Sequence, residues 1–104
     1  MESSYQLVIY PSASKDIENI CKYISIELAN PKAANDFLDE LYESFKSLVV
    51  FPKIYPLIDN QFVSDQSIRK MPVKRYMVFY RITNTEIQVI RVLHGRSDYI
   101  TLLK

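Results

Sequence analysis

The residues best suited to chemistry lie close together near the C-terminal end of the sequence, at His94, Arg96 and Tyr99. His94 is the only histidine, and an imidazole is the side chain best suited to move protons near neutral pH. With His94 as base, Tyr99 as proton donor and arginines that stabilise a phosphorane, these residues would suit a metal-independent ribonuclease. The alternative is that His94 and Gly95 only end a strand in a tight turn. A single histidine without a second clear acid-base partner favours that alternative.

Lysine and arginine are concentrated in the same part of the chain. Residues 67–104 hold eight bases and two acids, whereas residues 1–66 hold ten acids and five bases. The net charge is only +1, which argues against a general nucleic-acid binder, because such domains are usually far more basic. The asymmetry predicts a positive face at the C-terminal end of the fold and a more acidic helical side. The candidate target-binding residues of the basic region are Arg69, Lys70, Lys74, Arg75 and Arg81.

Several other kinds of site have no support in the sequence. It contains no glycine-rich phosphate loop, no zinc-binding cluster of Cys and His, and no Gly-x-Ser-x-Gly elbow, so we expect no cofactor and no metal. The single cysteine excludes an internal disulfide and fits a reducing compartment. There is no signal-peptide pattern and no apolar run of membrane-spanning length. We therefore expect a cytoplasmic protein without membrane contact, in which residues 1–104 form one domain.

The N-terminal part predicts one strand and a first helix. Residues 5–10 are rich in β-branched and aromatic side chains, which predicts a strand covered on both faces. Pro11 ends this strand, and Ser12 is the expected N-cap of the helix. The apolar stripe of this helix is Ile17, Ile20, Cys21, Ile24 and Leu28. Cys21 is accordingly expected to be a buried structural thiol.

A second helix begins after Asn30-Pro31, where Asn suits the cap and Pro the first helical position. The short connection predicts an antiparallel helix hairpin packed on a sheet. The stripe that packs inward is Ala34, Phe37, Leu38, Leu41, Phe45 and Leu48. The acidic residues of the outer face are either solvated or receive a partner. Residues 52–66 contain two prolines and no clear period, which predicts an irregular but packed connection.

Three strand-like segments follow, at residues 67–73, 76–83 and 86–94. Asn84-Thr85 suits a two-residue hairpin turn, because Asn tolerates positive φ. Counting back from this turn places Arg81 opposite Gln88 and Arg75 opposite His94. Arg91 then lies among apolar residues, so we expect it to be paired with a carboxylate. The fold class is therefore α+β, in the order β-α-α-β-β-β, with the helix hairpin on a small, mainly antiparallel twisted sheet.

Four segments together resemble the RelE/ParE superfamily of bacterial type II toxins. They are YQLVIYPSASKDIENICKYIS, LANPKAANDFLDELYESFKSL, IRKMPVKRYMVFYRI and IQVIRVLHGRSDY. The resemblance spans almost the whole chain, and RVLHG after an FYR strand is fairly specific to the superfamily. It implies the same helix hairpin on an antiparallel sheet. It also implies a cognate antitoxin that wraps and neutralises the toxin in a hetero-oligomeric complex.

The superfamily divides by target, and the resemblance leaves more than one function open. RelE-like members cleave mRNA on the ribosome, whereas ParE-like members inhibit DNA gyrase. RelE-like proteins tend to carry an arginine at the position of Met77, although Lys70 matches one of their other basic residues. The FYRI and RVLHG segments and the pI of 7.8 favour the ParE-like branch.

We therefore favour a growth-inhibiting toxin that acts on DNA gyrase. The first alternative is a ribosome-dependent mRNA endoribonuclease that uses His94, Arg96 and Tyr99, which lie where such relatives keep catalytic groups. The second is an inactive relative that only binds an antitoxin.

Overall fold

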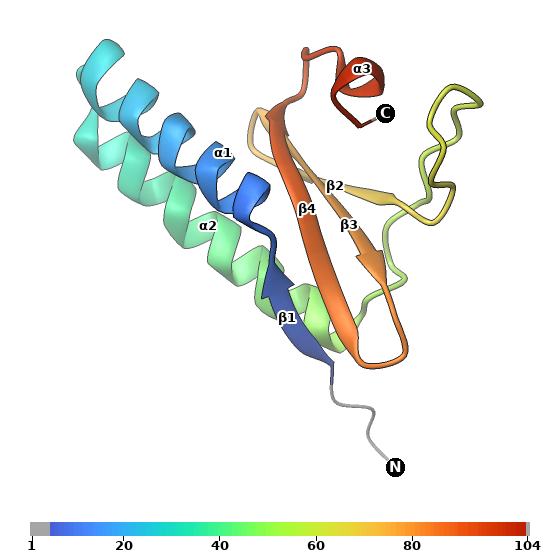
Figure 1. The fold of residues 1–104 in the computed structure, drawn as a ribbon. Coiled ribbons are helices and arrows are strands. Elements are labelled where there is room, and N and C mark those ends of the chain that lie inside the picture. The colour runs from blue at the N-terminus through green and yellow to red at the C-terminus, as the bar shows by residue number, and fades with distance from the viewer. Residues whose placement is uncertain (1–4, 104) are drawn as a thin grey trace.

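The computed structural model describes residues 5–103, which form four strands and three α-helices around a single sheet (Figure 1). In chain order the elements are β1 (Gln6–Ile9), α1 (Pro11–Lys22), a π-helical turn η1 (Tyr23–Glu27), α2 (Pro31–Val50), β2 (Arg69–Val73), β3 (Tyr76–Ile82), β4 (Glu86–His94) and α3 (Tyr99–Leu103). The predicted order β-α-α-β-β-β is confirmed. The sequence analysis did not anticipate η1 or α3. No helix of the described region is long and apolar enough to cross a membrane.

The sheet has the strand order β1-β4-β3-β2. β1 runs parallel to β4, and the other two pairs are antiparallel, so the sheet is mainly antiparallel as predicted. β1 is an edge strand, in which Gln6 is exposed and Leu7, Val8 and Ile9 are only partly buried. The expectation that this strand is covered on both faces is therefore wrong, because an edge position leaves part of each side chain accessible.

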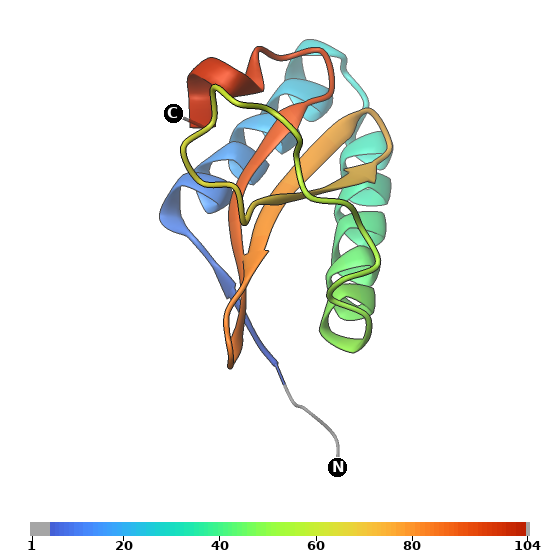
Figure 2. The same ribbon diagram turned by 90° about the vertical axis from the view of Figure 1, so that its right-hand side faces the viewer.

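Each face of the sheet is covered by a different layer (Figures 1 and 2). The antiparallel pair of α1 and α2 packs on one face, and the long loop with α3 covers the other. On the helix side, the buried core includes Phe37, Leu41, Tyr80 and Val89. On the loop side, a smaller core contains Ile58, Val63, Ile68, Phe79 and Leu93. We call these the helix-side core and the loop-side core.

The hairpin of β3 and β4 turns at the predicted residues, Asn84-Thr85, although neither of them has a positive φ. It does not keep the predicted register throughout. Arg81 pairs with Gln88 as expected, whereas the register shifts between Phe79 and Tyr80. His94 consequently faces Tyr76, so its predicted pairing with Arg75 is wrong. The reason is a β-bulge in β4, which inserts one unpaired residue and moves every later pair by one position.

The bulged residue is Ile90, and its carbonyl oxygen accepts a hydrogen bond from α1. The ladder passes from Val89 to Arg91, which leaves Ile90 without a partner on β3. The Ser12 hydroxyl donates a hydrogen bond of 2.8 Å to the Ile90 carbonyl oxygen. Ser12 therefore anchors α1 to the sheet and is not the N-cap. The N-cap is Tyr10, whose side chain makes no capping hydrogen bond, and Pro11 takes the first helical position.

The tip of the helix hairpin has an irregular backbone. α1 continues into the π-helical turn η1, and Ala29 closes the turn with a φ of 48°. α2 then begins as predicted, because the Asn30 side chain accepts a hydrogen bond of 3.1 Å from the Ala33 amide. A π-turn carries an extra residue per turn and so changes the helical phase. Leu28, which the regular stripe places inside, is consequently exposed.

The connection between α2 and β2 is irregular, as predicted, and hydrogen bonds to β2 and β3 hold it in place. The Tyr80 hydroxyl donates a hydrogen bond to the Pro52 carbonyl at 2.8 Å, and Arg69 Nη1 donates to the Tyr55 carbonyl at 2.7 Å. The Ile58 amide also bonds the Ile68 carbonyl at 2.9 Å. These bonds hold the loop against β2 and β3, where Ile58 and Ile68 enter the loop-side core.

Candidate functional site

A groove of about 1040 Å³ opens between the tip of the helix hairpin and the adjacent end of the sheet. One wall is largely apolar and comes from α1, η1 and α2. The opposite wall comes from the β2–β3 turn and the end of β4. The lining residues are Asp16, Asn19, Ile20, Tyr23, Ile24, Leu28, Ala33, Asp36, Phe37, Lys74, Arg75, Tyr76, Val92, Leu93 and His94.

The two carboxylates of the groove are already neutralised within the chain. Asp16 binds Arg91 through two hydrogen bonds, of 2.7 Å to Nε and 2.9 Å to Nη2. Asp36 forms an ion pair with Lys32 at 3.0 Å. The pairing expected for Arg91 is therefore confirmed. Lys74 and Arg75 form no ion pair with any residue between positions 5 and 103, so the groove keeps an excess of positive charge.

Two turns meet at the basic end of this groove. The Gly95 amide donates a hydrogen bond of 2.8 Å to the Arg75 carbonyl, which joins the β2–β3 turn to the segment after β4. A Cβ at Gly95 would lie 3.2 Å from that carbonyl oxygen, so the close approach favours glycine here. The Arg96 amide donates to His94 Nδ1 at 3.1 Å. We call the four exposed positions Lys74, Arg75, His94 and Arg96 the basic rim.

Lys74 has an unusual backbone conformation. Its φ is 53°, in the left-handed region that costs an ordinary L-residue about 1 kcal/mol or more. Glycine is the residue that this position of a tight turn favours. The chain carries a lysine there instead, and the lysine side chain is exposed at the edge of the groove.

The three nuclease candidates do not all lie on the same side of the sheet. The ring of His94 packs edge-on against Tyr76, with 5.4 Å between the ring centroids, and lines the groove beside the helices. Tyr99 packs instead against Phe79 at 5.2 Å and belongs to the loop-side core. Arg96 follows His94 closely in the chain and is exposed. The structure thus brings His94 and Arg96 to the basic rim and places Tyr99 on the opposite face.

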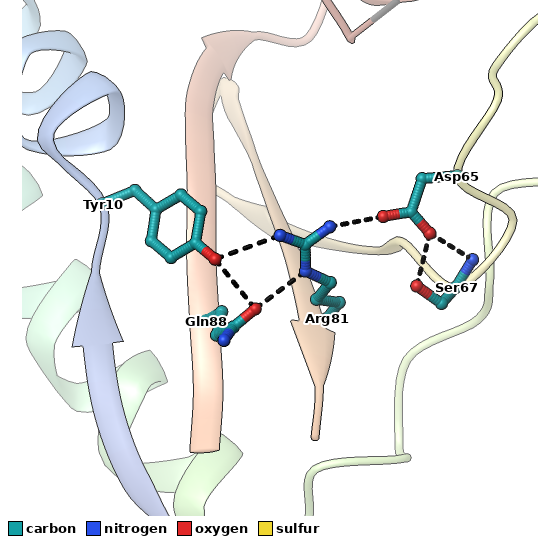
Figure 3. Close-up of polar contacts among 5 residues, drawn as sticks. All are labelled: Tyr10, Asp65, Ser67, Arg81 and Gln88. Atoms are coloured by element: carbon teal, nitrogen blue, oxygen red, sulfur yellow. Dashed lines mark hydrogen bonds and ion pairs between the residues drawn. The ribbon is translucent and has the colours of Figure 1, made fainter.

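Arg81, a candidate for target binding, is engaged within the chain (Figure 3). Its guanidinium donates to Gln88 Oε1 at 2.8 Å, to the Tyr10 hydroxyl at 3.0 Å and to the Asp65 carboxylate. The Tyr10 hydroxyl and Asp65 hold the pKa of Arg81 above its usual range, against the effect of desolvation. Asp65 also accepts hydrogen bonds from the Ser67 hydroxyl and amide. Arg81 therefore connects the sheet to the long loop.

The remaining target-binding candidates differ in their surroundings. Lys74 and Arg75 lie on the basic rim, whereas Arg69 is partly buried and bonded to Tyr55. Lys70 is partly buried on β2 and forms no ion pair within the described part of the chain. Met77 packs against the loop-side core.

The apolar wall of the groove was not recognised from the sequence. Tyr23 lies outside the predicted stripe and is 52% exposed, and Leu28 is 56% exposed. An available signal was the density of large apolar residues between positions 20 and 28, which is more than one helical stripe requires. Cys21 is only partly buried against the helix-side core, and burial raises the pKa of its thiol.

Comparisons with known proteins agree with this architecture. The chain is similar to a protein of the chromosomal ParDE toxin-antitoxin system from P. aeruginosa, with a TM-score of 0.72, 18% identity, and coverage of 89% of this chain and 98% of that one. It is also similar to a chain of the E. coli DinJ-YafQ toxin-antitoxin complex, with a TM-score of 0.57, 15% identity, and coverage of 88% and 93%. At these identities the likeness concerns the fold. No curated protein matches the sequence.

The family model gives a more specific result. Residues 7–99 match the model of the ParE toxin of the type II toxin-antitoxin system parDE. The match extends from β1 to the start of α3, so it includes the groove and the basic rim. The chain therefore belongs to the ParE toxin family, and it is a toxin component of a type II toxin-antitoxin system with an antitoxin as its partner.

Proposed function

We propose that this toxin arrests growth by binding and inhibiting DNA gyrase, and not by cleaving RNA. The observation that carries the proposal is the separation of His94 from Tyr99. A general base and a general acid must both reach the same phosphodiester group, within hydrogen-bond distance of the atoms that exchange protons. Here Tyr99 packs on Phe79 in the loop-side core, whereas His94 lines the groove on the helix side. Met77, in place of a phosphate-binding arginine, supports the same conclusion.

The test compares the two activities in parallel on the purified toxin. We expect inhibition of gyrase supercoiling, and no codon-periodic mRNA cuts when ribosomes and mRNA are present. His94→Ala should weaken the gyrase inhibition by no more than a few-fold, through the lost packing on Tyr76, because no proton transfer is involved. Ribosome-dependent cuts that slow by about 100-fold or more in His94→Ala would refute the proposal and establish the ribonuclease alternative. A toxin with neither activity that still binds its antitoxin would be the inactive relative.

We also propose that the groove receives an acidic, amphipathic segment of the antitoxin. The groove offers an apolar wall that includes Tyr23 and Leu28, and it faces Lys74 and Arg75, which have no carboxylate partner among residues 5–103. A segment with one apolar face and acidic flanks complements both walls. The cytoplasm, where such an antitoxin would be made, is the compartment we propose for the toxin.

A matched pair of substitutions tests this second proposal. Leu28→Glu places a carboxylate on the apolar wall, where it loses hydration and repels acidic groups of the partner. We expect the affinity for the antitoxin to fall by about 30-fold, the equivalent of 2 kcal/mol at an interface hot spot. The control is Ile26→Glu, because Ile26 is 71% exposed on the same turn and does not line the groove. Equal affinities of the two variants would contradict the proposal.

A further inference from the structure

The arginines of residues 69–96, together with Lys74, divide into two groups, whereas Lys70 is partly buried on β2 and belongs to neither. Arg81 and Arg91 form ion pairs with Asp65 and Asp16, and Arg69 donates to a backbone carbonyl. The lysine and two arginines of the basic rim, Lys74, Arg75 and Arg96, form no ion pair within residues 5–103. The first group therefore stabilises the fold, and the second is free to bind an external anion.

The backbone holds these three cations in a defined arrangement. The hydrogen bond from the Gly95 amide to the Arg75 carbonyl joins the two turns that carry them. The edge-on contact of His94 with Tyr76 fixes the end of β4 between the turns. Lys74 keeps its left-handed conformation although glycine would adopt it without strain. Strained residues cluster at functional sites, and the side chain of Lys74 adds an exposed positive charge at this position.

Beyond the groove that we propose for the antitoxin, the rim offers positive charge and no apolar surface, which suits a phosphate backbone. Apolar side chains form the centres of protein interfaces. The apolar residues near the rim lie in the adjacent groove, whereas the four rim positions carry exposed charged or ionisable side chains. Phosphate oxygens are contacted chiefly by exposed lysine and arginine side chains and by backbone amides.

We propose that Lys74, Arg75 and Arg96 of the basic rim bind the phosphate backbone of the DNA held by gyrase. The inference rests on the proposed function, because it assigns the DNA as a second partner within the inhibited complex. The net charge of +1 is too small for strong binding to DNA alone. The rim contributes when the toxin is already held on gyrase, since the DNA is then present at a high effective concentration.

The test compares the affinity of the toxin for the gyrase–DNA complex with its affinity for gyrase alone. We call the ratio of these two affinities the DNA-dependent gain. Each phosphate contact lowers log affinity by about 0.9 per tenfold rise in salt, so three contacts weaken the DNA-dependent gain by about 40-fold between about 50 mM and about 200 mM salt. Lys74→Gly combined with Arg96→Gln removes two charges and relieves the strain at position 74. In this variant the gain should fall by only about threefold over the same range, as expected for the one remaining contact.

The control variant carries Lys46→Gln and Lys53→Gln. It loses the same total charge from exposed positions on α2 and the following loop, so it should keep the wild-type salt dependence. The proposal is overturned if the wild-type toxin shows no DNA-dependent gain, or if the rim variant keeps the whole gain. A rim variant that loses affinity for the antitoxin alone, with the DNA-dependent gain intact, would assign the rim to an acidic protein and also overturn it.

A direct measurement separates this inference from the proposed function. Fluorescence anisotropy of a labelled DNA duplex at low salt reports rim binding without gyrase. If the toxin does not bind gyrase, the proposed function fails. Weak duplex binding that disappears in the rim variant and persists in the control would still support the rim as a phosphate site, whereas equal binding by all three proteins would exclude it.

Discussion

Replacing Asp16 by alanine should destabilise the fold strongly, although Asp16 lies on the surface of a helix. Its carboxylate accepts hydrogen bonds from Nε and Nη2 of Arg91, at 2.7 and 2.9 Å, and from the Val92 amide at 3.0 Å. The side chains of Arg91 and Asp16 are only 24% and 13% exposed. Asp16 also raises the pKa of Arg91, against the effect of desolvation. One carboxylate thus links α1 to β4 just after the bulge.

The expected loss of unfolding free energy follows from these three hydrogen bonds. A charged, bidentate pair contributes about 2 kcal/mol after desolvation, and the orphaned Val92 amide adds about 1 kcal/mol. The total of about 3 kcal/mol is at the lower end of the values for breaking a buried ion pair. A low value is expected because both side chains remain partly exposed to solvent. With a urea dependence of about 1.5 kcal/mol per molar, the midpoint of unfolding should fall by about 2 M.

Urea unfolding followed by circular dichroism measures this shift. The control is Glu18→Ala, which removes an exposed acid of the same helix whose ion pair with Lys22 is also exposed, and it should leave the midpoint nearly unchanged. In a double-mutant cycle, Arg91→Met should cost much less in the Asp16→Ala background than alone. A midpoint that falls by less than about 0.7 M, or additive effects of the two substitutions, would refute the account of this pair.

Three further predictions concern titration and reactivity. Burial raises the pKa of Tyr80 from 10.0 to about 12, so its contribution to stability is complete below pH 10.0 and is lost as pH rises through about 12. Burial also raises the pKa of Tyr76, so near-ultraviolet absorbance should show late tyrosine ionisation, and Tyr80→Phe should remove the step near pH 12. Hydrogen bonds from the Ser67 hydroxyl and amide, together with Arg81, lower the pKa of Asp65 below 3.8. The contribution of Asp65 to folding stability is therefore present above pH 3.8 and is lost as pH falls below it. Asp65→Asn should flatten this acid dependence of the unfolding free energy in urea titrations. Burial raises the pKa of Cys21 above 9.0, so alkylation near neutral pH should be slower in the native protein than in urea, and equal rates would contradict the burial.

The sequence was sufficient to predict elements whose signals are local. The cap at Asn30 and the two-residue turn at Asn84-Thr85 depend on residues next to one another in the chain. The cap is confirmed, and so is the place of the turn, although neither turn residue has the positive φ that was expected of Asn. The inward stripe of α2 is confirmed as well, with Leu38 only partly buried, because a regular helix repeats its buried face at a fixed spacing. Resemblance of several segments then gave the toxin superfamily, which the family match confirms.

Local signals failed where the backbone is irregular and where a side chain bonds a distant segment. Ser12 is a residue type that often caps helices, but its hydroxyl donates a hydrogen bond to the carbonyl of Ile90, which is far away in sequence. The bulge at Ile90 changed the residue opposite His94, and the π-turn before Leu28 turned that side chain out of the core. Each irregularity shifts the phase of every residue that follows it, so a regular period cannot anticipate it.

For function, the sequence by itself determined the composition of the basic region and the family. It could not determine which cations are available, since that depends on which of them find a carboxylate or carbonyl after folding. The tertiary structure neutralises Arg81 and Arg91 with Asp65 and Asp16, and it leaves Lys74 and Arg75 beside an apolar groove. It also places Tyr99 across the sheet from His94, because Tyr99 packs on a residue of the face opposite the helices.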